Sequence, residues 1–126
     1  MKKVIISTEN APAAIGAYSQ AVMAGGVLYT SGQLGLVPAT GSLAGDDIKS
    51  QSEQALLNLK AIVLAAGFTM DDVVKTTVFL SDIAQFSEFN DVYSSFFSQN
   101  PPARSCVAVK ALPKNALVEI ELVASK

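Results

Sequence analysis

One segment combines residue types suited to binding an acid group, and it reads Pro102-Ala103-Arg104-Ser105-Cys106-Val107. Two consecutive prolines, Pro101 and Pro102, form a rigid segment before a predicted strand that begins at Arg104. Because side chains alternate along a strand, Arg104 and Cys106 share one of its faces. A guanidinium held in this way can bind a substrate carboxylate through two parallel hydrogen bonds, which lysine does less well. The alternative, slightly favoured by the spacing alone, is an ion pair with a glutamate at a subunit contact.

Two glutamates, Glu119 and Glu121, alternate with apolar residues on the last predicted strand. The alternation directs both carboxylates away from the core. If their face lines a cleft between subunits, one carboxylate could orient or deprotonate a water molecule. The alternative is that both glutamates only form a solvated face.

The chain contains a single cysteine, Cys106, and no histidine. Histidine is the commonest general base and metal ligand, so its absence argues against a zinc or iron site. Without an imidazole beside it, the Cys106 thiol lacks an evident activator, and we expect a buried structural thiol with main-chain groups available for binding. No dinucleotide or phosphate-binding glycine pattern occurs, so we expect neither a metal nor a cofactor.

Small polar groups also occur in two glycine-containing turns. Tyr18 follows Gly16-Ala17, and the second turn reads Thr30-Ser31-Gly32-Gln33. From the sequence alone, both are compatible with ordinary turn chemistry.

The hydrophobic pattern predicts an α+β fold in the order β-β-β-α-β-α-β-β, as a single domain over residues 1–126. Strands are predicted at residues 3–7, 20–24, 27–31, 73–80, 104–111 and 117–124, with a hairpin at Gly25-Gly26. We expect two helices to cover one face of a mixed sheet, and another subunit to cover the other face.

The two helices are predicted at residues 47–66 and 82–98. Gly67 ends the first, and a capping box of Asp82 and Gln85 begins the second. The apolar face of the second helix is assigned to core packing rather than to an aromatic binding site, and it consists of Ile83, Phe86, Phe89, Tyr93 and Phe97.

Composition favours subunit association. Apolar residues make up 50% of the 126 residues and charged residues 16%, which are too few charges to coat a monomer, so we expect a homo-oligomer. The net charge of −2 and the lack of a basic run argue against nucleic acid as a partner. We find no signal-peptide core, membrane span or need for an oxidising compartment, so we expect a cytoplasmic protein.

Four segments, taken together and in order, resemble the Rid/YjgF family: residues 9–16 (ENAPAAIG), 30–33 (TSGQ), 102–107 (PARSCV) and 117–121 (LVEIE). Residues 58–63 and 74–79 extend the resemblance over nearly the whole chain. It implies a chorismate-mutase-like α+β fold and a homotrimer with three clefts between subunits. It also implies a cofactor-free hydrolysis of 2-iminopropanoate and 2-iminobutanoate, the tautomers of reactive enamines, to 2-oxo acids and ammonia.

The resemblance also assigns roles to individual residues. Arg104 would bind the substrate carboxylate, Glu119 would position the attacking water, and Cys106 would contribute mainly main-chain contacts. The pocket wall would be completed by Tyr18, Ser31, Gly32 and Asn90. Such a reaction needs no histidine, because a protonated imine is already electrophilic and requires mainly orientation and a placed water.

Two loop positions depart from the family pattern. Ala17 stands where relatives usually carry proline, and Leu34-Gly35 replaces a common Ile-Pro, which bears on substrate size more than on reaction type.

Two other functions stay open. One is a non-catalytic module that senses 2-oxo acids in the same cleft. The other is the ribonuclease or translation-inhibitor activity attributed to some relatives, against which the acidic composition argues.

Overall fold

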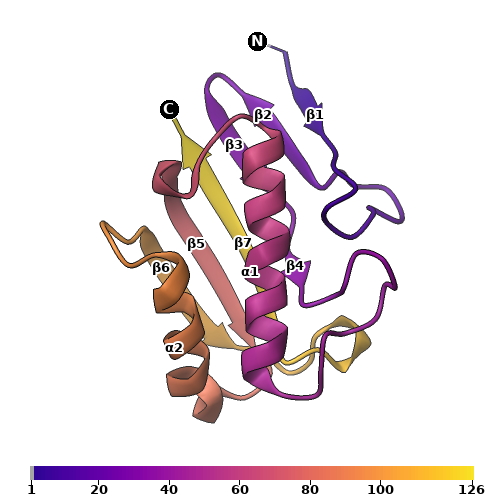
Figure 1. Ribbon diagram of the computed structural model, residues 1–126, viewed down its shortest axis with the longest axis vertical. Coiled ribbons are helices and arrows are strands. Elements are labelled where there is room, and N and C mark those ends of the chain that lie inside the picture. Colours follow the sequence, from indigo (N-terminus) through magenta and orange to yellow (C-terminus); the bar gives the residue numbers. More distant parts are fainter. Residues whose placement is uncertain (1) are drawn as a thin grey trace.

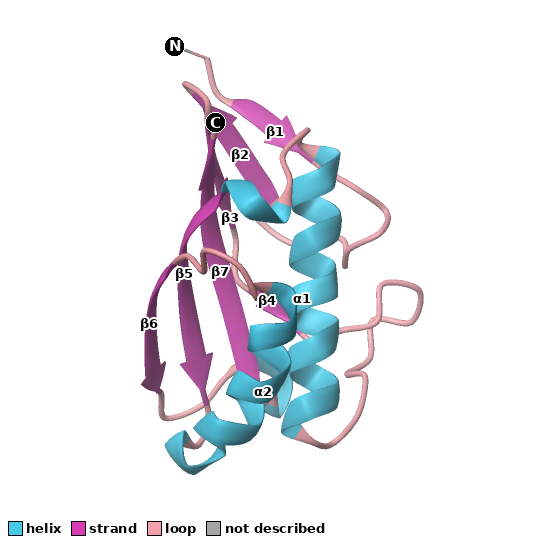
Figure 2. Cartoon of the chain, turned by 60° about the vertical axis from the view of Figure 1, so that its left-hand side comes forward, coloured by secondary structure: helices cyan, strands magenta, loops and turns pink. Residues whose placement is uncertain are grey.

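Seven strands form one sheet, and the two long helices lie over the same face of it (Figures 1 and 2). The computed structural model describes residues 2–126. The strands are β1 (Val4–Ile6), β2 (Ala21–Ala24), β3 (Val27–Thr30), β4 (Gln33–Leu34), β5 (Val73–Leu80), β6 (Ala103–Ala108) and β7 (Val118–Ser125). The helices are α1 (Ile48–Ala65) and α2 (Phe86–Phe96), with short 3-10 turns η1 (Met70–Asp72), η2 (Ile83–Gln85) and η3 (Pro113–Asn115). The predicted α+β class is confirmed, and β4 is added to the predicted order.

The sheet is mixed, in the order β1-β2-β3-β7-β5-β6, with β4 beside β7. Among the strands of residues 2–126, β5 and β6 are the only pair in parallel. The crossover that joins them contains α2, since parallel strands need a long connection. Strands β2 and β3 join through Gly25 and Gly26, whose φ angles of 58° and 78° suit a two-residue hairpin turn. The predicted hairpin is confirmed.

Helix α1 begins and ends where its capping residues predict. The Asp47 carboxylate accepts a hydrogen bond from the Ser50 amide at 3.0 Å and caps the first turn. Gly67 follows the last turn with a φ of 85°, a conformation that favours glycine. The buried side of the helix includes Leu59 and Ile62, both fully buried against the sheet.

The second helical segment differs from the prediction at its start. The turn η2 precedes α2, and Asp82 Oδ1 accepts a hydrogen bond from the Ala84 amide at 2.9 Å. Gln85 Oε1 is buried without a hydrogen-bond partner among residues 2–126, so the predicted capping box is wrong. Because the chain turns before α2, Ile83 is 54% exposed rather than part of the core face.

Several strand ends also differ from the prediction. Strand β6 runs from Ala103 to Ala108 rather than over 104–111, because its partner β5 ends at Leu80, opposite Ala108. The pairing of β4 with β7 was not predicted, since two strand residues among turn residues show no periodicity. This short strand fixes the position of the adjacent Gly32.

The helices cover one face of the sheet and leave the other face uncovered. Beneath the helices lies the main core, which includes Leu28, Val78 and Ile120. The opposite face, called here the open face, carries Tyr29 and Val107, which are 49% and 48% exposed. That another subunit packs on this open face stays a prediction. Across residues 2–126, none of the helices is both long and apolar enough to span a membrane.

Candidate active site

Arg104 lies on β6 and is held by α2. Its Nη1 atom donates a hydrogen bond to Asn90 Oδ1 at 2.8 Å. The central guanidinium carbon lies 4.6 Å from the ring centroid of Tyr93 and 5.3 Å from that of Phe86. These two distances are typical of a cation resting against aromatic faces. The side chain is therefore partly buried in a defined position.

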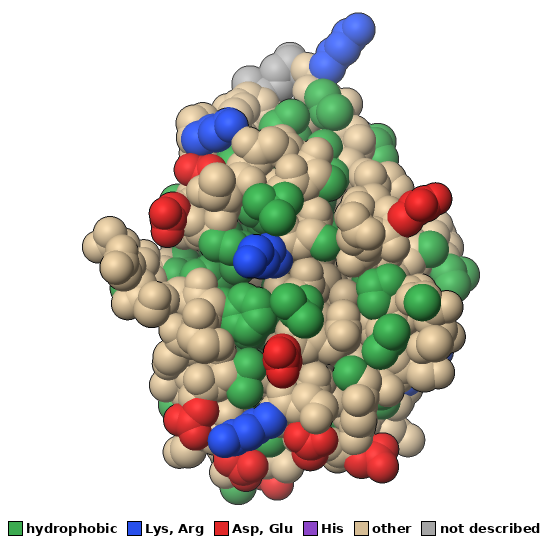
Figure 3. Space-filling view, viewed as in Figure 1, with side chains coloured by type: hydrophobic (Ala, Val, Ile, Leu, Met, Phe, Trp, Pro, Cys, Tyr) green, Lys and Arg blue, Asp and Glu red, His purple; other side chains and the backbone are tan. Residues whose placement is uncertain are grey.

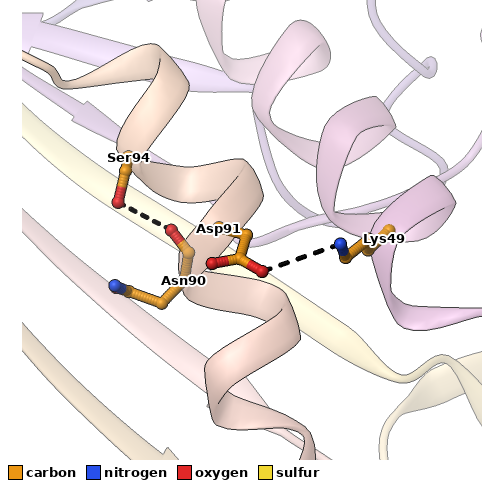
Figure 4. A network of polar contacts seen from close by, with 4 residues as sticks. All are labelled: Lys49, Asn90, Asp91 and Ser94. Atoms are coloured by element: carbon orange, nitrogen blue, oxygen red, sulfur yellow. Dashed lines mark hydrogen bonds and ion pairs between the residues drawn. The ribbon is translucent and has the colours of Figure 1, made fainter.

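The three residues that contact Arg104 recur along one side of α2. Phe86, Asn90 and Tyr93 are spaced by four and three residues, so they share one helix face. Figure 4 shows the Asn90 side chain pointing away from the neighbouring ion pair between Lys49 and Asp91, whose charged atoms are 3.6 Å apart. Asn90 is thus directed to Arg104 and not to the charged network between the helices.

No carboxylate of the described chain neutralises Arg104. Among residues 2–126 the one ion pair found joins Lys49 to Asp91. The alternative ion pair, with a glutamate at a subunit contact, would involve a second copy of the chain and stays a prediction. Next to the guanidinium lies a cavity of about 340 Å³. It is lined by Asn90, Tyr93, Ser94, Phe97, Pro102 and Arg104.

Cys106 follows Arg104 on the same side of β6. In the strand register Arg104 lies opposite Thr76 and Cys106 lies opposite Val78, both of which are buried beneath the helices. Burial raises the pKa of the Cys106 thiol, and the nearby Arg104 charge opposes this only in part. A thiol whose pKa is raised is a poor nucleophile at neutral pH.

A second cavity, of about 620 Å³, gathers the other predicted site residues. It contains Tyr18, Ser31, Gly32 and Glu119, and its apolar wall includes Ile15 and Leu34. The Ser31 hydroxyl donates a hydrogen bond to the Ser19 carbonyl at 2.6 Å. A Cβ atom at position 32 would lie 2.7 Å from Glu119 Oε2, so a larger residue would displace this carboxylate.

The carboxyl of Glu119 is partly buried at the edge of this second cavity. Burial raises its pKa above the usual range, and the like charge of Glu121 on the same strand raises it further. A carboxylate with a raised pKa is a stronger base than one in water. Within the described chain, no three histidine, cysteine or acidic side chains are grouped to hold a metal ion.

Arg104 and Glu119 point to opposite faces of the sheet. Arg104 lies opposite Thr76 and Glu119 lies opposite Phe79, and these two partners face opposite ways on β5. The predicted residues thus form two separate groups. The arginine group is Arg104, Asn90 and Cys106, and the glutamate group is Glu119, Tyr18, Ser31 and Gly32.

The sequence did not predict the contacts of Arg104 with two aromatic rings. Phe86 and Tyr93 were assigned to core packing, and Tyr93 does belong to the core cluster. Its ring also faces the guanidinium, a contact that helical periodicity cannot reveal because Arg104 lies on a distant strand. Of the departures from the family pattern, Leu34 lines the second cavity, while a Cβ at Gly35 would overlap the main chain of Gln51.

The chain is similar to known proteins over nearly its whole length. The family model described as endoribonuclease L-PSP matches residues 8–126. A RutC family protein of Pyrococcus horikoshii is 48% identical over 98% of each chain. The 2-iminobutanoate/2-iminopropanoate deaminase of Rattus norvegicus is 48% identical over 95% of this chain and 88% of its own. The crystal structure of Escherichia coli TdcF with bound serine has a TM-score of 0.94 at 44% identity, covering 98% of both chains. The chain belongs to the Rid/YjgF family, described in that model as endoribonuclease L-PSP.

Proposed function

We propose that this protein is a hydrolytic deaminase that converts 2-imino acids, such as 2-iminopropanoate and 2-iminobutanoate, to 2-oxo acids and ammonia without a cofactor. The observation that carries the proposal is a guanidinium held by Asn90 and two aromatic rings, with no carboxylate of the described chain to neutralise it. Such a cation suits a substrate carboxylate. The similarity to the rat deaminase supports this choice of substrate.

A homotrimer would complete the site, with the arginine group of one subunit facing the glutamate group of the next. This assembly is part of the proposal because Arg104 and Glu119 lie on opposite faces of one sheet. The exposed Tyr29 and Val107 on the open face are suited to a subunit contact, since burying them would remove apolar surface from water.

The chemistry follows from these positions. Arg104 binds the carboxylate and fixes the imine carbon in place. Glu119 orients a water molecule and takes its proton as the water oxygen bonds to the electrophilic carbon of the protonated imine. Glu119 then returns this proton to the nitrogen of the carbinolamine. The C–N bond breaks as the C=O bond forms, and the proton of the carbinolamine hydroxyl passes to the departing ammonia. Each turnover consumes one water and releases one 2-oxo acid and one ammonium ion.

The direct test is an assay of ammonia release from 2-aminoacrylate generated in solution. We expect the wild-type protein to accelerate release and Arg104→Ala to abolish the acceleration while the circular dichroism spectrum stays unchanged. Lys49→Ala is the control, because it removes an exposed cation that pairs with Asp91 and with no residue of either group. Full activity in the Arg104 variant would refute the site.

A second candidate is a non-catalytic module that binds amino or 2-oxo acids. The observation in its favour is that the similar Escherichia coli TdcF was crystallised with serine bound. Saturable binding of 2-oxobutanoate without any imine hydrolysis would favour this function over the enzyme.

Ribonuclease activity, which the family description names, has less support here. The net charge is −2, and on the helix-covered face the lysine and arginine side chains lie apart, interspersed with acidic ones (Figure 3). Binding an RNA backbone needs clustered cations. RNA cleavage that copurifies with the protein and is lost in a Glu119 or Arg104 variant would support it.

A further inference from the structure

A buried pair of hydroxyl groups lies behind the Arg104 guanidinium. The hydroxyl oxygens of Thr76 and Tyr93 are 2.7 Å apart and share a hydrogen bond. Both side chains are buried, with exposed fractions of 0% and 4%. Thr76 is also the register partner of Arg104 on the neighbouring strand. The sheet, the tyrosine and the arginine are thus connected through direct contacts.

Packing alone does not require these hydroxyls. Thr76 shares the core face of β5 with Val78 and Leu80, where valine would fill nearly the same volume. Phenylalanine would likewise fill the volume of Tyr93. A buried hydroxyl is costly unless it finds a partner, so two apolar side chains would serve a purely structural role at least as well. The polar pair therefore calls for another explanation.

The hydrogen bond fixes the position of the Tyr93 ring. A phenyl ring without the hydroxyl could slide or tilt within the core, whereas the bond to Thr76 attaches the ring's far end to the sheet. The guanidinium carbon lies 4.6 Å above this ring, and Asn90 accepts one N–H bond from the guanidinium. Ring and amide together restrict both the plane of the guanidinium and its rotation within that plane.

We infer that Tyr93, anchored by Thr76, is a positioning residue that sets the orientation of the Arg104 guanidinium for a carboxylate. The inference rests on the proposed function. Bidentate binding of a carboxylate uses two parallel N–H donors in one plane, so a guanidinium that is already oriented loses less freedom on binding. Loosening the ring therefore weakens binding of the acid group and leaves the chemical step intact.

The test uses Thr76→Val, Tyr93→Phe and the double variant, with Thr77→Val as the control on the other face of β5. We expect each core variant to raise KM, and the dissociation constant of 2-oxobutanoate, roughly three- to tenfold, as loosening one cation–aromatic contact should do. The turnover number should change little.

The double variant separates positioning from stability. Each single variant leaves one buried hydroxyl unpaired and should lower the melting temperature, whereas the double variant should regain much of that loss. We expect its KM to stay raised. A normal KM and a normal 2-oxobutanoate affinity in all three variants would overturn the inference while leaving the deaminase proposal intact. Absence of both turnover and 2-oxobutanoate binding in the wild-type protein would overturn both.

Discussion

Arg104 and Glu119 lie on strands separated only by β5, yet their side chains leave the sheet on opposite faces. One chain therefore cannot bring this cation and this carboxylate to the same small molecule. If both act in one reaction, two copies of the chain must supply them.

Mixing two inactive variants tests this arrangement. We expect Arg104→Ala and Glu119→Gln each to be inactive, and oligomers formed by refolding them together to regain activity. Random assortment in a trimer would leave both residues intact in about one quarter of the clefts. Activity that remains at the level of the separate variants would show that the two residues do not meet between subunits.

The pH dependence should report the raised pKa of Glu119. Its carboxylate must be charged to act as a base, so the rate should fall as pH falls through a pKa that burial and Glu121 hold above the usual range. Replacing Glu121 with glutamine removes the like charge, and the acid limb of kcat/KM should move to lower pH. In this variant, burial should still hold the pKa of Glu119 above its ordinary value.

Glu53→Gln serves as the control for this measurement, because Glu53 is exposed on α1 and its replacement removes the same charge. An acid limb that is the same in the wild-type protein and the Glu121 variant would mean that another group controls the rate.

Gly32→Ala should impair turnover through a local overlap. The added methyl group would lie 2.7 Å from Glu119 Oε2 and 2.9 Å from its carboxyl carbon, so the carboxylate must shift. A misplacement of about 1 Å can cost about 100-fold in rate. We expect kcat to fall while the melting temperature stays within a few degrees. A large loss of thermal stability with normal kcat per folded molecule would contradict this prediction.

Gln20→Ala should loosen the loop beside the second cavity. Gln20 is buried, accepts a hydrogen bond from the Thr8 amide at 2.7 Å, and donates to the Pro12 carbonyl at 2.8 Å. Its loss should lower the free energy of unfolding by about 1–3 kcal/mol, since buried main-chain groups lose their partners. Amide exchange over residues 8–15 should rise, and kcat/KM should fall because Ile15 belongs to the cavity wall.

The control for this variant is Gln99→Ala, which removes an exposed amide beyond α2. Equal amide exchange in the two variants would show that Gln20 does not hold the loop.

Most of the secondary structure, and the chemical character of the candidate site, could be predicted from local patterns in the sequence. An apolar, β-branched run identified β5, and alternation directed Glu119 away from the core. Helical periodicity together with Asp47 and Gly67 located α1. These signals are local, because side-chain periodicity and capping depend on residues a few positions apart.

Which of those residues meet depends on tertiary packing. Tyr93 looked like any core aromatic, and only the crossover through α2 brings its ring against Arg104. Strand order and register divided the site residues into two groups, and β4 brought Gly32 against Glu119. Contacts between distant segments depend on how strands pair and helices pack, which no short stretch of sequence encodes.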